Sequence, residues 1–450
     1  MEESQKVLGS VAISASVIKE VDQEVKDITQ YTQKIKDKLS SSVTDLVDII
    51  LYGAIVLNSS DIHLEPQEQN ARLRIRIDGL LQDVIFFERS LYRQLLSRLK
   101  LLSRLKLNIT QKPQDGRFTI KLQNLLIEIR TSSLPAEYGE SIVMRILNPK
   151  NLLSLEDLGL REDLYEIFLK EIQKPNGMII VTGPTGSGKT TTLYAFLTKI
   201  RDPSIKIITI EDPIEYHLKG ISQTQVNPER GYTFAEGLRS IVRQDPDVIL
   251  VGEIRDLETA KIALQAALTG HLVLSTLHTN DAAGTIPRLV ELGADPASIA
   301  PALKMVVAQR LSRRICKKCA IPCKPTPKEK EEIEKGLQNL PSNVKIPDLN
   351  NLLLYQPKKE GCSFCNYTGY KGRIALFEVF LVDTEMERFI LTNPPVSAIR
   401  ELAIKKGMVT MYQSGLIAIA SGITTFPEVQ RVVGIEEQKE AIKRVYLKEE

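Results

Sequence analysis

The pattern that most constrains the fold of this chain is a glycine-rich run that ends in Gly-Lys-Thr. Its spacing, a glycine, four residues and then Gly-Lys-Thr, matches a phosphate-binding loop. An apolar run at 178–181 precedes it and a helix-forming run at 191–200 follows it. Glycines let backbone N–H groups wrap phosphates, and the helix N-terminus adds positive potential. The predicted nucleotide contacts are Gly183, Pro184, Thr185, Gly186, Ser187, Gly188, Lys189, Thr190 and Thr191.

Two residues of this loop have distinct predicted roles. Lys189 pairs with the β- and γ-phosphates, and the Thr190 hydroxyl holds Mg²⁺. The alternative is a glycine-rich turn that matches by chance, but the flanking strand and helix argue against it. The predicted ligands are therefore ATP and Mg²⁺.

The region around this loop, residues 151–315, alternates strand and helix signals. Its strand candidates are apolar at nearly every position, which suits parallel strands buried on both faces. They lie at 178–181, 205–210, 248–251 and 272–274. Asp256 is a predicted helix N-cap, with Glu258 in the first turn. The predicted fold class is α/β, with a RecA-like P-loop NTPase domain.

Polar residues follow three of these strands, at the edge where such sheets bind ligands. Glu253 could orient or deprotonate an attacking water. Glu211 opens an acidic segment, 211–215, that suits Mg²⁺ or water positioning, and an exposed acidic loop is an almost equal alternative. His278 could sense the γ-phosphate, although a lone histidine is more commonly structural.

Phosphoryl transfer also needs cations at the γ-phosphate, which often come from a neighbouring subunit. The candidates are Arg117, Arg130, Arg239 and Arg243, of which the last two are one helical turn apart. Basic residues usually lie on solvated faces, so each of them alone is a weak signal.

Four cysteines form two C-x-x-C pairs. Four thiolates in a tetrahedron suit a structural Zn²⁺ site, with free thiols as the alternative. The predicted ligands are Cys316, Cys319, Cys362 and Cys365, whereas Cys323 is predicted to be a plain thiol.

Two further parts precede the P-loop domain. Residues 1–44 carry apolar side chains at steps of three or four, which predicts a helical arm or linker. This stripe could pack on its own chain or dock a partner, and the first is preferred because a stripe alone names no partner. Residues 45–150 predict a smaller α/β domain. Within it, 71–77 alternates apolar residues with arginine, which predicts a half-buried strand, and Asp78-Gly79 predicts a turn.

Two other segments affect the predicted domain division. Leucines recur along 91–107, where LLSRLK occurs twice, and we interpret this segment as one helix. The Lys/Glu/Pro-rich stretch 324–350 predicts an exposed insert. The last predicted domain is the ATPase domain, 151–450, which contains a zinc subdomain near 316–365.

The composition restricts the compartment and the partners. The 450 residues are enough for two or three domains. A net charge of +3, 5% aromatic residues and no tryptophan argue against a nucleic-acid partner. The sequence has no apolar run of about 18 residues and no secretory signal in its first ten residues. A cytosolic protein is therefore predicted.

With these residues identified, the chain resembles the ATPase family of type II secretion and type IV pilus assembly. The likeness runs from about residue 45 to the C-terminus. Besides the phosphate loop, its motifs lie at 59–66, 113–117, 210–215, 243–247, 251–256 and 275–281. Glu253 falls on the family's catalytic glutamate, and His278 ends its histidine box. The four-cysteine insert is similar to that of the secretion and pilus-extension branches.

The resemblance implies a homohexamer with ATP between the P-loop domain and the smaller domain, where Arg117 and Arg130 would reach the phosphates. Hydrolysis would drive an inner-membrane platform protein from the cytoplasmic side, and no direct contact with pilin is expected. Family members often carry an N-terminal docking domain where this chain has only the short arm, which leaves the docking partner open.

Two other functions fit parts of the sequence. A DNA-translocating P-loop motor would share the phosphate loop, but the near-neutral charge and scarce aromatics argue against it. A nucleotide-gated scaffold without turnover would not need Lys189, Thr190 and Glu253, which are all present.

Overall fold

The structure is a computed structural model that describes residues 10–122, 125–433, 442 and 445. The start of the predicted arm and most of 434–450 lie outside the described residues. The chain divides into two compact units. The first unit comprises Met1–Asn151, Cys316–Ala320 and Pro357–Lys371, and the second comprises Leu152–Ile315, Ile321–Gln356 and Gly372–Glu450. The predicted division into an arm, a smaller domain and an ATPase domain stays a prediction.

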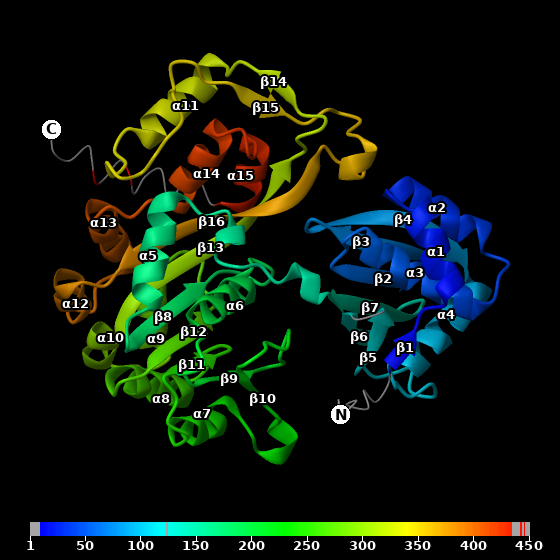
Figure 1. Ribbon diagram of the computed structural model, residues 1–450, viewed down its shortest axis with the longest axis horizontal. Helices are drawn as coiled ribbons and strands as arrows, with labels where there is room; N and C mark the ends of the chain where they lie inside the picture. The colour runs from blue at the N-terminus through cyan, green and yellow to red at the C-terminus, as the bar shows by residue number, and fades with distance from the viewer. Residues whose placement is uncertain (1–9, 123–124, 434–441, 443–444, 446–450) are drawn as a thin grey trace. The chain divides into compact units, whose positions relative to one another are not determined.

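The first unit is a seven-stranded sheet with helices packed on one face (Figure 1). Its strand order is β1 (Ser10–Ala12), β5 (Gln114–Leu122), β6 (Leu125–Ala136), β7 (Gly139–Leu147), β2 (Asp61–Pro66), β3 (Asn70–Ile77) and β4 (Leu80–Glu88). The predicted strand at 71–77 is confirmed as β3, whose residues alternate between the core and the other face. The predicted turn is confirmed as well, since Asp78 and Gly79 have φ of 50° and 87°.

The helices of the first unit are α1 (Ala15–Glu24), α2 (Ile28–Asp37), α3 (Val43–Val56) and α4 (Arg89–Leu102). The predicted helical stripe forms two helices, α1 and α2, because the Asp27 side chain accepts the Gln30 N–H at 2.9 Å and caps the second. Val17, Val21 and Tyr31 of the stripe are buried in the unit's own core.

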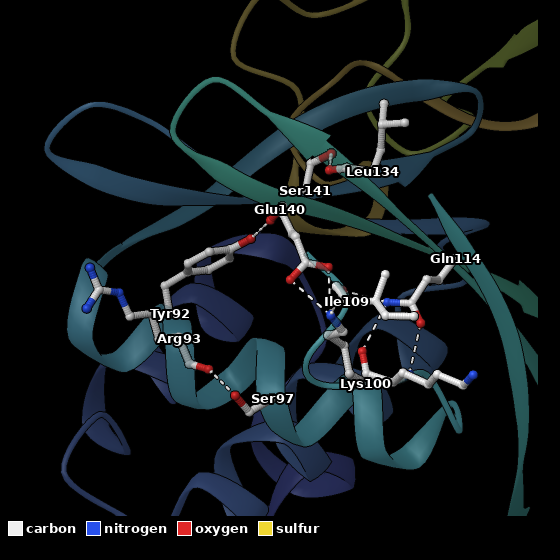
Figure 2. A network of polar contacts seen from close by, with 10 residues as sticks. Tyr92, Arg93, Ser97, Lys100, Ile109, Gln114, Leu134, Glu140 and Ser141 are labelled. Atoms are coloured by element: carbon white, nitrogen blue, oxygen red, sulfur yellow. Dashed lines mark hydrogen bonds and ion pairs between the residues drawn. The ribbon is translucent and has the colours of Figure 1, made fainter. Parts of the chain in front are cut away.

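A buried ion pair holds α4 on the sheet (Figure 2). Lys100 is 2% exposed and Glu140, on β7, is 6% exposed. Lys100 Nζ lies 2.7 Å from Glu140 Oε1 and donates to the Ile109 carbonyl oxygen at 2.8 Å. The helix ends at Leu102, earlier than the predicted 107, because Arg104 has a left-handed backbone (φ 60°) and turns the chain back.

The second unit contains a second seven-stranded sheet. Its strand order is β10 (Ser222–Gln225), β9 (Ile207–Glu211), β11 (Val248–Val251), β12 (Leu272–Leu277), β8 (Gly177–Thr182), β13 (Leu303–Ile315) and β16 (Tyr370–Leu381). The pairs from β10 through to β13 are parallel, and β9, β11, β12 and β8 are buried at every position. All four predicted buried strands are thus confirmed.

Helices cover both faces of this sheet (Figure 1). One face packs against α5 (Glu162–Ile172) and α6 (Lys189–Ile200). The other face packs against α7 (Phe234–Val242), α8 (Leu257–Leu268), α9 (Thr285–Glu291), α10 (Pro296–Ala302), α12 (Thr384–Ile390), α13 (Val396–Lys405), α14 (Met411–Ala420) and α15 (Phe426–Val432). Asp256 caps α8 as predicted, accepting the Thr259 N–H at 2.8 Å. The predicted α/β fold is confirmed.

The segment predicted as an exposed insert contains a packed helix, α11 (Pro327–Leu337). Thr326 and Glu329 form a capping box at its start, and its apolar residues Ile333 and Leu337 are buried in the core of the second unit. The short strands β14 (Ile321–Cys323) and β15 (Leu354–Gln356) flank it. Within the described residues, no helix is both long and apolar enough to cross a bilayer.

We predict that Glu140→Gln destabilises the first unit by roughly 3–5 kcal/mol, because the buried Lys100 ammonium would lose its counter-charge. The measurement is urea unfolding followed by circular dichroism. Asp83→Asn is the control, since Asp83 forms an exposed ion pair with Arg72 at 3.8 Å. We expect that control to cost no more than about 1 kcal/mol. Equal losses in the two variants would contradict a special contribution from the buried pair.

Candidate functional site

The phosphate loop joins β8 directly to α6. Gly186 and Gly188 have φ of 79° and 89°, a left-handed backbone that favours glycine. A side chain at Gly183 would meet the Gln309 carbonyl oxygen at 2.6 Å. Pro184 to Gly186 are exposed, whereas Thr190 and Thr191 are half-buried. The loop therefore presents backbone N–H groups at the N-terminus of a twelve-residue helix, as a polyphosphate site requires.

Glu253 and His278 lie beside this loop, because they follow parallel strands on one side of β8 in the sheet. His278 Nε2 is 3.6 Å from Glu253 Oε2, and Glu253 Oε1 is 2.6 Å from Arg255 Nη2. Lys189 Nζ donates to the Gly183 carbonyl oxygen at 2.9 Å. The structure thus brings together three of the predicted site residues.

The pKa values of these groups reflect their closeness. Burial lowers the pKa of Lys189, and the charge of Glu253 opposes that shift. Burial also lowers the pKa of His278, the Lys189 charge acts in the same direction, and Glu253 opposes both. The lowered pKa favours the neutral form of the His278 imidazole.

Glu211 lies at the end of β9 with both carboxylate oxygens occupied. One accepts the Thr209 hydroxyl at 2.6 Å and the Gln223 amide at 3.1 Å, and the other accepts the Tyr194 hydroxyl in a short hydrogen bond. The side chain is buried. In this conformation Glu211 links α6, β9 and β10, and its predicted chemical role stays a prediction.

The predicted arginines lie in two places. Arg239 and Arg243 are at the C-terminal end of α7, where Arg239 pairs with Glu236 and Glu258 and Arg243 donates to Ser240 Oγ at 3.2 Å. Arg117 and Arg130 belong to the first unit.

Arg117 on β5 is directly opposite Arg130 on β6, and Arg130 is directly opposite Arg145 on β7. Directly opposed like charges destabilise a sheet. Glu128 pairs with Arg130 at 3.1 Å, and Asp61 pairs with Arg145 at 3.2 Å.

Three arginines near the predicted site residues were not predicted from the sequence. Arg255 could have been noticed two residues after Glu253, and Arg145 as a charge inside an apolar strand. Arg310 on β13 left no local signal, yet its Nη2 donates to the Asn280 carbonyl oxygen at 2.7 Å, just after His278.

The four predicted cysteine ligands come together in the first unit. Their sulfur atoms all lie within 4.8 Å of one another, and Cys316–Cys362 and Cys319–Cys365 are each 3.8 Å apart. Tetrahedral zinc with Zn–S bonds of about 2.3 Å places its sulfurs about 3.8 Å apart. The cluster therefore could hold a metal ion, and Cys323 is not part of it.

With this geometry established, the comparisons with known proteins identify the family. The model of the type II/IV secretion system protein family matches residues 36–431. The chain belongs to this family. The predicted resemblance to the ATPases of type II secretion and type IV pilus assembly is therefore confirmed.

Three curated relatives of this family member illustrate the likeness. The type II secretion system protein HxcR of Pseudomonas aeruginosa is 41% identical over 414 residues, which are 92% of this chain and 82% of HxcR. The type II secretion system ATPase E of Vibrio cholerae is 42% identical over 410 residues, 90% of this chain and 78% of that protein. The type IV pilus assembly ATPase PilB of Thermus thermophilus is 43% identical over 390 residues, 86% of this chain but only 43% of PilB. This chain therefore spans less than half of that PilB.

Solved structures agree with the fold of this family member. The pilus retraction motor PilT, crystallised with bound ADP, has a TM-score of 0.57 and 26% identity and covers 87% of this chain and 98% of PilT. The ATPase DotB of Legionella pneumophila has a TM-score of 0.61 and 21% identity, over 86% of this chain and 94% of DotB.

We predict opposite shifts in the pKa of His278 when its two charged neighbours are neutralised. Lys189→Met should raise it because a nearby cation disappears, and Glu253→Gln should lower it because a favourable carboxylate disappears. NMR titration of the imidazole signals is the measurement, and only four histidines need assignment. His271 serves as the internal control. Shifts of the same sign in both variants would contradict the observed arrangement.

Proposed function

We propose that this chain hydrolyses ATP to ADP and phosphate and thereby powers assembly of a type IV pilus or a type II secretion pseudopilus. The observation that carries the proposal is the convergence of Lys189, Glu253 and His278 beside a phosphate loop at one sheet edge. The family and the names of the relatives support the same activity.

The proposed mechanism assigns one task to each group. Backbone N–H groups of the loop and the Lys189 ammonium bind the phosphates and neutralise charge that develops during transfer. Glu253 orients a water molecule, whose oxygen forms a bond to the γ-phosphorus while the bond to the β–γ bridging oxygen breaks. Glu253 accepts the proton released by that water. His278, held neutral, contacts the γ-phosphate.

Further residues complete the proposed site. Thr190 would hold Mg²⁺, which supplies charge neutralisation at the phosphates when it is bound. Glu211 is a second acidic candidate. Arg117 and Arg130, and Arg239 and Arg243 from a neighbouring subunit, are the proposed cations for the transferred phosphoryl group.

At the level of assembly, we propose a homohexamer that acts on an inner-membrane platform protein. It would work in the cytoplasm, in peripheral contact with the inner membrane and without touching pilin directly. We keep the predicted arm, smaller domain and ATPase domain as its proposed working parts, with the zinc subdomain near 316–365.

We expect slow Mg²⁺-dependent release of phosphate from ATP by the purified protein. Lys189→Ala and Glu253→Gln should each lower it at least roughly tenfold, because charge stabilisation or water positioning is lost. A malachite-green assay measures this. Lys261→Ala, an exposed substitution on α8, is the control and should match the parent. A parent that binds ATP but releases no more phosphate than Glu253→Gln would favour a nucleotide-gated scaffold instead.

We further propose that the cysteine cluster binds one Zn²⁺ in a structural role, because all four ligands come from the chain. We expect about one zinc per chain by mass spectrometry of the metal, and loss of that zinc in Cys362→Ser together with a lower melting temperature. Cys323→Ser is the matched control, since it removes a thiol outside the cluster. Equal zinc content in the parent and Cys362→Ser would refute the assignment.

A further inference from the structure

The segment that directly follows His278 is held by hydrogen bonds at successive residues. The Thr279 N–H donates to Thr182 Oγ1 at 2.9 Å, and Thr182 is the last residue of β8 before the phosphate loop. The Asn280 carbonyl oxygen accepts from Arg310 Nη2 at 2.7 Å. These two bonds tie the segment to β8, which leads into the phosphate loop, and to the neighbouring strand β13.

The next two residues are held by the C-terminal part of the second unit. Asp281 Oδ2 pairs with Arg400 Nη2 on α13 at 2.5 Å, and both side chains are largely buried. The Ala282 N–H donates to Glu378 Oε1 on β16 at 3.0 Å. Residues about a hundred positions away in the sequence thus fix the backbone beside His278.

Glu378 has a second contact of the same kind. Its other oxygen, Oε2, accepts the N–H of Met411, the first residue of α14, at 3.0 Å. The side chain is 1% exposed. Burial raises the pKa of Glu378, and the charge of Asp281 adds to that shift, whereas the two backbone N–H groups and Arg400 oppose it. Burying a carboxylate in such a position costs folding free energy unless both of its oxygens accept hydrogen bonds.

We propose that Glu378 is a positioning residue for ATP hydrolysis, whose carboxylate joins the segment after His278 to the start of α14 and so fixes the imidazole at the γ-phosphate. This inference rests on the proposed function. Glutamine has the same shape but only one acceptor oxygen, so Glu378→Gln breaks one of the two backbone bonds. Because Thr279 is bonded to Thr182, a shift of this segment also reaches the phosphate loop.

The test compares Glu378→Gln with Glu428→Gln. Glu428 is equally buried, at 2% exposure, in the same unit, and it also binds a backbone N–H, that of Arg313 at 3.2 Å. It also pairs with the guanidinium groups of Arg313 and Arg431, neither of which belongs to the segment after His278. Both variants should lower the melting temperature. Only Glu378→Gln should lower kcat for ATP, by about tenfold or more, with KM unchanged within about twofold.

A second comparison shows whether Glu378 acts through His278. In a His278→Ala background, adding Glu378→Gln should reduce kcat no further, because the group that it positions is already absent. Equal kcat losses in Glu378→Gln and Glu428→Gln, or additive losses with His278→Ala, would overturn the inference. So would an unchanged kcat in His278→Ala.

Should Glu378→Gln fail to fold, Asp281→Asn tests the same segment. It keeps the bond from the Gly284 N–H to Oδ1 at 2.8 Å and removes the charge that pairs with Arg400. We expect the same loss of kcat without a change in KM, and an unchanged kcat would count against the inference. A parent protein that does not release phosphate at all would instead refute the proposed function.

Discussion

The parallel hydrogen-bonding register between β8, β12 and β11 is the constraint on which the candidate site depends. Leu277 pairs with Thr182 at the ends of β12 and β8, and Val251 at the end of β11 pairs with Ser275, so His278 directly follows one of these pairs and Glu253 follows the other by two residues. A slip of two residues would leave every side chain on its own face but would move His278 by about 7 Å. The contact between Glu253 and His278 and the nearness of both to the Lys189 charge therefore require this register. Apolar packing on both faces stabilises it, because any odd-numbered slip would exchange the two cores.

Buried carboxylates perform different tasks in the two units, and their partners distinguish them. Glu140 neutralises the buried Lys100 and holds α4 on the sheet, so it stabilises the first unit. Among the described residues, Glu211 accepts hydrogen bonds from the neutral hydroxyl and amide groups of Thr209, Tyr194 and Gln223. Glu378 binds backbone N–H groups from two segments that are otherwise unrelated. One of these N–H groups belongs to the segment after His278, and this is why the proposed positioning role falls on Glu378 rather than on Glu140.

The sequence predicted those parts of the site whose signals are local. The phosphate loop, the strands before Glu253 and His278, and the Asp256 cap all lie within short segments whose pattern specifies their structure. The arginine and carboxylate contacts behind His278 could not be predicted, because Arg310, Glu378 and Arg400 are single charges in unrelated segments. The contacts of these three residues depend on the tertiary structure, which the spacing of residues in the sequence does not predict. The shortened α4 and the buried face of α11 also differ from prediction, because the left-handed backbone at Arg104 turns the chain and Ile333 is buried in the core of the second unit.

The arginine row of the first unit supports the proposed role of Arg117 and Arg130 by an argument from charge. Three arginines are directly opposed on adjacent strands, and the repulsion between them lowers the stability of the sheet. Glu128 and Asp61 neutralise part of this charge, but Asp61 also pairs with Arg76 at 3.2 Å. Arg117 is exposed, so an anion can reach its guanidinium group. An anion bound at this row would reduce the repulsion between the arginines. A polyphosphate supplies several negative charges at once, and the planar guanidinium forks suit its oxygens.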